Sequence, residues 1–165
     1  MTPAAGTGMV HRVLESWWAP RRVVRGLAGM PDRVLIAVLM LAMLIFLIAQ
    51  APMNARAAQI DPSIPLDARM AGSLMAVIFI MPLLAYGVAG LVALISRAAP
   101  RRLAPRESRL ALFWALLAVA PAMLLSGLVA GMIGPGPALT LTRVVAGLGF
   151  LFIWGAGIAA LARRN

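Results

Sequence analysis

Four long apolar segments without a single charged residue constrain this chain more than any other feature. They cover residues 34–51, 70–95, 110–133 and 144–162, and hydrophilic segments rich in arginine separate them. A helix needs ~20 mostly apolar residues to cross the ~30 Å hydrocarbon core of a bilayer. The sequence therefore predicts an all-α fold, an integral membrane four-helix bundle, in which residues 34–165 form the membrane domain and residues 1–33 a cytoplasmic N-terminal segment.

The composition agrees with a membrane protein and argues against a nucleic-acid partner. Hydrophobic residues make up 62% of the 165 residues, and the formal net charge is +10. In a soluble protein that charge would favour nucleic-acid binding. Here the arginines flank the apolar segments instead of forming one continuous face. We therefore expect the lipid bilayer, and no nucleic acid, to be the partner of this charge.

Arginine is distributed unevenly over the hydrophilic segments. All fifteen basic residues are arginine, and twelve lie before span one, between spans two and three, and after span four. The other three, Arg56, Arg69 and Arg143, lie in the two remaining loops. Because basic loops tend to stay on the cytoplasmic side, we predict that both termini are cytoplasmic. Arginine without lysine, beside abundant alanine, glycine and proline, is typical of a GC-rich bacterial genome, so we expect the bacterial inner membrane.

The N-terminal segment has the pattern of an interfacial amphipathic helix. Val10, Val13, Leu14, Trp17 and Trp18 follow the spacing of one helix face, and Pro20 opens a second short helical piece. Tryptophan favours the headgroup region, and arginine near an anionic leaflet strengthens binding. An interfacial helix that binds anionic lipid headgroups and a docking helix for a protein partner both fit. The candidate surface residues are Trp17, Trp18, Arg21, Arg22, Arg25, Arg101, Arg102 and Arg106.

The sequence lacks the combinations of residues that catalysis or metal binding requires. The chain has no cysteine and one histidine, His11, and no span contains an ionisable residue other than Tyr86. Coupled transporters usually need a charged group buried in the bundle, and hydrolases need a nucleophile with a base. The sequence therefore predicts no enzyme and no catalytic, cofactor-binding or metal-binding residues.

Prolines and glycines inside the spans indicate how the helices pack. Pro82 and Pro121 fall near the middle of spans two and three, where they either shape packing or form a discontinuous-helix substrate site. Gly127 and Gly131 form a GxxxG match, and Gly155 begins a small-xxx-small match. Such residues allow close approach of helices. Packing of span three on span four, or dimerisation, would explain both matches.

The two loops predicted on the non-cytoplasmic side differ in length. The first covers residues 52–69 and contains Pro52. The second is the turn Gly134–Pro137, followed by Thr142, which we expect to cap span four. A turn this short makes spans three and four antiparallel neighbours.

Three stretches carry a family resemblance. They are the segment from Trp17 to Leu27, the proline-centred Ile80 to Gly87, and Leu112 to Leu116. Together these resemble bacterial members of the Yip domain family, named for Ypt/Rab-interacting proteins. The resemblance implies a multi-spanning helical bundle with a cytoplasmic N-terminal region and no catalytic residues.

Two functions of different classes fit these features. The first is a non-enzymatic scaffold, assembly or membrane-organising protein that acts through its basic cytoplasmic face, with a membrane-protein partner or as a homo-oligomer. The second is a small transporter or channel with a site at Pro82 and Pro121. The absence of charge inside the spans favours the first.

Overall fold

A computed structural model describes residues 8–98 and 101–164, with the backbone alone at positions 101, 163 and 164. The described chain is almost entirely helical, with one very short pair of strands. In chain order the elements are α1 (Met9–Glu15), α2 (Pro20–Gly26), α3 (Asp32–Ile60), α4 (Leu66–Leu74), η1 (Met75–Ile80), α5 (Met81–Ser96), β1 (Arg101–Arg102), α6 (Pro105–Met132), α7 (Pro137–Leu161) and β2 (Arg163–Arg164).

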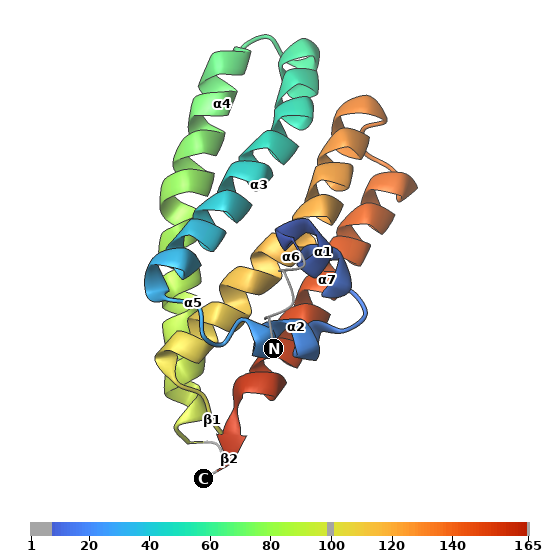
Figure 1. The fold of residues 1–165 in the computed structure, drawn as a ribbon. Helices are drawn as coiled ribbons and strands as arrows, with labels where there is room; N and C mark the ends of the chain where they lie inside the picture. The colour runs from blue at the N-terminus through green and yellow to red at the C-terminus, as the bar shows by residue number, and fades with distance from the viewer. Residues whose placement is uncertain (1–7, 99–100, 165) are drawn as a thin grey trace.

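Four of these helical segments are long and apolar enough to cross a membrane. They are α3, the continuous stretch of α4, η1 and α5, then α6, and finally α7. This confirms the predicted all-α, four-helix membrane fold. The four segments run alternately up and down between two ends (Figure 1). We call the end with the α3 start, the α5 end, the α6 start and the C-terminus the basic end, and the opposite one the far end.

Helix α6 forms the centre of the bundle. It packs against α3 on one side and α7 on the other, and it also contacts α5 and α1. Phe113 and Trp114 are buried, and almost every residue from position 110 to 120 is buried with them. At the basic end β1 pairs antiparallel with β2, which joins the segment before α6 to the end of α7.

The first inter-helix loop is much shorter than the sequence suggests. Helix α3 continues through Pro52 to Ile60, so the predicted loop over residues 52–69 is wrong, and only residues 61–65 connect α3 to α4. Contacts with other helices stabilise the extension: Asn54 donates a hydrogen bond to Ser73 Oγ at 2.8 Å. Arg56 donates to the carbonyls of Gly131 and Met132 at 3.3 and 3.4 Å, at the C-terminal end of α6.

The turn between α6 and α7 is short, as predicted, and the two helices are packed neighbours. Helix α7 starts earlier than expected, at Pro137, because proline suits the first helical position, where no amide hydrogen is needed. Thr142 therefore does not cap the helix, and its hydroxyl donates to the Leu139 carbonyl at 3.0 Å. Gly134 has φ +92°, a conformation that favours glycine.

Glycines pack the bundle, but with different partners from those predicted. A Cβ atom at Gly127 would overlap the Ala49 carbonyl, and one at Gly131 would overlap Pro52. The GxxxG face of α6 therefore packs on α3, and not on α7. Nothing lies within 4 Å of a Cβ built at Gly155, so Gly155 does not pack against another helix of the described chain, and its part in dimerisation stays a prediction.

A π-helical segment interrupts the second span. It covers Met75–Ile80 and ends just before Pro82 in the first turn of α5. Proline has no amide hydrogen, and its ring clashes with the carbonyl four residues earlier in an α-helix. The wider π-helical turn relieves this clash. Pro82 thus shapes the helix at the middle of the span.

Candidate functional site

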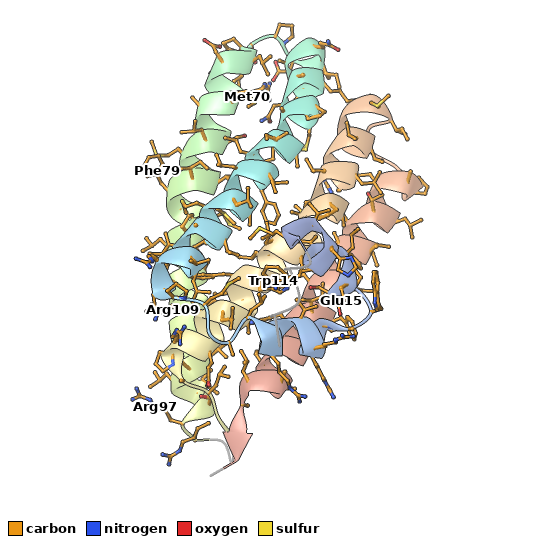
Figure 2. All side chains as sticks on the ribbon, viewed as in Figure 1. Glu15, Met70, Phe79, Arg97, Arg109 and Trp114 are labelled. Carbon is orange, nitrogen blue, oxygen red and sulfur yellow. The ribbon has the colours of Figure 1, made fainter. Side chains whose placement is uncertain are left out.

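Two tryptophan indoles attach the N-terminal segment to the bundle. Trp17 donates from Nε1 to the carbonyl of Ala118 at 3.0 Å, and Trp114 donates from Nε1 to Ser16 Oγ at 2.9 Å. Ser16 in turn donates to the carbonyl of Arg12 at 2.7 Å. Figure 2 shows Trp114 in the body of the bundle, beside α1. These bonds join a segment near the N-terminus to the middle of α6.

Pro121 lies close to the carbonyl that Trp17 contacts. Proline inside a helix removes one backbone donor and disturbs the hydrogen bonds of the preceding turn. The carbonyl of Ala118 lies in that turn of α6, and Ala118 itself is fully buried. The amide that Pro121 lacks is the one that would bond the Leu117 carbonyl, and the Trp17 indole donates to the next carbonyl, that of Ala118. The N-terminal segment is thus docked one residue from the carbonyl that Pro121 leaves without its helical donor.

Part of the predicted amphipathic face is buried against the bundle instead of being available to lipid or a partner. Val13 and Trp17 face α6 and α7, and a Cβ at Gly149 would overlap the Trp17 ring. Because the indole is packed in this way, Trp17 is an anchor in the bundle and not an exposed surface residue. In α2, Val23 and Val24 are buried, and Val24 lies against Gly157.

An apolar stripe on α1 and the residues after it stays exposed. Val10, Leu14 and Trp18 are spaced four residues apart, and they are 74%, 49% and 68% exposed. Residues four apart lie on one helix face. This stripe points away from the bundle, so it is the part of the predicted amphipathic face that remains available for lipid or a partner.

A groove lies between this segment and α7, and we call it the basic groove. It has a volume of about 510 Å³. Its lining residues are Trp18, Ala19, Pro20, Arg21, Arg22, Phe152, Gly155 and Ala156. Arg21 and Arg22 are exposed, and Phe152 is 52% exposed. Gly155, which packs no helix, leaves space for this groove.

Positive charge dominates the basic groove. Arg22 Nε lies 3.7 Å from Glu15 Oε1, and His11 Nε2 lies 4.0 Å from Glu15 Oε2. Within the described residues, neither Arg21 nor Arg25 takes part in an ion pair. One carboxylate therefore offsets only part of the charge of three neighbouring arginines. An anionic group is the complementary ligand.

The other predicted surface arginines differ in their availability. Arg102 is exposed, whereas Arg106 pairs with Asp32 (Nε to Oδ1, 3.3 Å) and donates to the Met30 carbonyl. Arg109 also reaches Asp32, at 3.4 Å. Arg106 thus joins the start of α6 to the start of α3, and its side chain has a structural role. The side chain of Arg101 lies outside the described residues.

A second cavity, missed by the sequence, lies among all four membrane helices. This four-helix cavity has a volume of about 700 Å³. Its lining is mostly apolar and includes Phe46, Met53, Met81, Met123 and Phe150, with three polar side chains. The polar residues are Gln50, Ser126 and Arg143. The sequence could not predict that Gln50 and Ser126 line the same cavity, because this depends on how α3 and α6 cross.

The two mid-span prolines do not meet at a common site in the described structure. Pro121 is exposed, Pro82 is half-buried, and the residues that line the four-helix cavity include neither. Met81, next to Pro82, does line it. A substrate site formed by both prolines stays a prediction.

The acidic side chains serve local structure. Asp61 accepts hydrogen bonds from the Ser63 hydroxyl and amide at 2.5 and 3.1 Å, and Arg69 lies 3.3 Å away. The hydrogen bonds from Ser63, followed by the charge of Arg69, lower the pKa of Asp61 in this exposed loop. In the part of the chain that is described, no cluster of three histidine, cysteine or acidic residues is placed to hold a metal.

The comparisons with known proteins found no matching family model, no matching curated protein and no matching solved structure. The resemblance to the Yip domain family therefore stays a prediction.

Proposed function

We propose that this protein is a non-enzymatic, multi-pass membrane protein that organises anionic phospholipid at the cytoplasmic face of the bacterial inner membrane. The observation that carries the proposal is the basic groove, in which Arg21 and Arg22 lie beside an exposed tryptophan and an apolar strip of α7. A family relationship to Yip domain proteins would agree with a non-catalytic role for such a bundle.

The chemistry of the groove suits a phospholipid at a membrane surface. Guanidinium groups bind phosphate through paired hydrogen bonds. Trp18 has the amphipathic ring that favours the headgroup layer. Phe152 and Ala156 offer apolar surface to the part of an acyl chain nearest the headgroup. The exposed stripe of Val10, Leu14 and Trp18 would continue this contact into the interface.

Charge elsewhere at the basic end would strengthen the attraction. Arg33, Arg97 and Arg102 are exposed there, and Figure 2 shows Arg97 at that end of the bundle. Each arginine near an anionic surface contributes about 1 kcal/mol, and this contribution is screened by salt. The basic end therefore supplies general attraction, and the groove supplies a defined site on the side of the bundle that leads to this end.

Titration of the purified protein with phosphatidylglycerol, followed by native mass spectrometry, tests the proposal. We expect the double variant Arg21→Gln/Arg22→Gln to weaken phosphatidylglycerol binding about tenfold or more, because it removes two charge-assisted hydrogen bonds to the phosphate in the groove. Binding of phosphatidylcholine, whose headgroup carries no net charge, should change much less.

The matched control removes the same charge outside the groove. Arg33 and Arg97 are exposed at the basic end and form no ion pair among the described residues. The variant Arg33→Gln/Arg97→Gln should lose only a small part of the affinity. Equal losses in the two double variants, or no loss in either, would contradict a headgroup site in the groove.

A further inference from the structure

The four-helix cavity has an ordered distribution of polarity along its length. Met53, Ala130 and Arg143 line it nearest the far end, Gln50 and Ser126 line its middle, and apolar residues line the rest toward the basic end. Those apolar residues include Phe46, Leu116, Met81 and Phe150. One end of the cavity is therefore cationic and the other is apolar.

The polar side chains in this cavity lack partners among the described residues. Ser126 is only 6% exposed, yet no hydrogen bond engages its hydroxyl, and none engages the Gln50 amide. Within the described part of the chain, the Arg143 side chain donates one hydrogen bond, to the Met53 sulfur at 4.0 Å, and sulfur is a weak acceptor. Gln50 is half-buried and Arg143 is exposed, so these polar groups are accessible to a ligand in the cavity. This arrangement indicates a ligand that brings acceptor atoms.

The dimensions fit one acyl chain. The lining of α6 extends from Leu116 to Ala130, which corresponds to about 20 Å at ~1.5 Å per residue. One leaflet takes up about half of the ~30 Å hydrocarbon core of a bilayer. The extended acyl chain of one lipid therefore has a length similar to that of the cavity lining. The volume of about 700 Å³ lies within the usual range for small-molecule sites.

From these features we propose that the four-helix cavity binds a long-chain fatty acid. Its carboxylate would contact Arg143, with Gln50 and Ser126 as additional donors, and its chain would extend toward Phe46 and Phe150. A single guanidinium matches a single carboxylate by two parallel hydrogen bonds. This site is separate from the basic groove and does not depend on the proposed function.

Photocrosslinking of a diazirine-bearing palmitate to the purified protein in mild detergent tests the site. Peptide mass spectrometry should place the adducts on cavity-lining segments of α3 and α6. Palmitate should compete with the probe, whereas methyl palmitate, which has no charge, should compete at least tenfold less well. Equal competition by the acid and its ester, or by phosphatidylglycerol and the acid, would overturn the assignment.

Two variants test the two ends of the cavity. Arg143→Gln should weaken palmitate binding about tenfold or more by removing the charge-assisted bond. Gly147→Leu should block the chain, because Gly147 lines the cavity and a Cβ there meets no atom within 4 Å. The leucine can thus occupy the cavity without a backbone clash.

Matched controls separate these effects from a general loss of fold. Gly90→Leu introduces the same side chain at another open glycine, on α5 outside the cavity, and Arg69→Gln removes another far-end charge. Both should bind palmitate like the unaltered protein, as should Arg21→Gln/Arg22→Gln. Wild-type affinity in Arg143→Gln or in Gly147→Leu would contradict the proposed site.

Discussion

At the residue scale, two indole N–H groups determine how the N-terminal segment is held. Trp17 and Trp114 each donate one hydrogen bond across the interface between this segment and α6. Buried tryptophans usually find a partner for this donor. Ser16, which receives the bond from Trp114, is fully buried although its sequence neighbours Leu14 and Trp18 are exposed. Side-chain hydrogen bonds thus convert an amphipathic segment into a docked one.

Replacement of Trp17 by phenylalanine tests this docking. The substitution keeps an aromatic ring but removes the donor to the Ala118 carbonyl, so we expect a loss of about 1–3 kcal/mol in the free energy of unfolding. The measurement is thermal or denaturant unfolding of the purified protein in mild detergent. Trp18→Phe is the control, since Trp18 is exposed and its indole donates no hydrogen bond among the described residues. Equal effects of the two substitutions would contradict an anchoring role for Trp17.

The sequence could identify the residue types of this contact but not the partners. An amphipathic segment with two tryptophans was predictable from spacing. Which of the two indoles turns inward was not, because the choice depends on the Ala118 carbonyl near Pro121 and on the space at Gly149. Trp114, an indole near the start of an apolar span, was a signal that a polar partner must lie nearby.

At the element scale, the close packing of α3 against α6 is the main helix–helix contact. Gly127 and Gly131 allow the two backbones to approach at Ala49 and Pro52. Without a hydrophobic driving force between helices in lipid, such close packing is an important source of association. The hydrogen bonds of Arg56 at the α6 C-terminus add to the same contact.

Gly127→Ala should disrupt this contact. The added Cβ would overlap the Ala49 carbonyl, so the helices must move apart, and we expect a cost of about 1–3 kcal/mol from overpacking. The unfolding temperature in mild detergent measures it. Gly90→Ala adds the same methyl group where nothing lies within 4 Å, and should leave the unfolding temperature unchanged or slightly higher. A fall of the same size in both variants would show that α3–α6 packing is not the cause.

The number and type of helices could be predicted from the sequence, but their ends could not. Uninterrupted apolar segments specify helices in a membrane, because every backbone polar group must be satisfied internally. Pro52 was a poor boundary signal, because tertiary contacts of Asn54 and Arg56 support the helix beyond it. Likewise, the four-helix cavity depends on helix crossing angles, which hydropathy does not encode.

At the scale of the whole molecule, the two ends of the bundle differ in charge and in shape. The basic end carries the strand pair and exposed arginines such as Arg33, Arg97 and Arg102, and the N-terminal helices lie against the bundle between its middle and this end (Figure 1). The far end carries two short inter-helix connections and Arg143, which lines the four-helix cavity nearest that end. An asymmetric bundle of this kind would present lipid-headgroup chemistry on one side of a membrane and a separate cavity toward the other.

The most direct test of this account is the membrane sidedness of the two ends. The chain has no cysteine, so single cysteines can be introduced without removing others. Ser63 in the far-end loop and Ala98 at the basic end are both exposed. With a membrane-impermeant maleimide on intact spheroplasts, we expect labelling of the Ser63→Cys variant, and labelling of the Ala98→Cys variant only after the membrane is opened. Labelling of Ala98→Cys in intact spheroplasts, with Ser63→Cys protected, would contradict a cytoplasmic basic end.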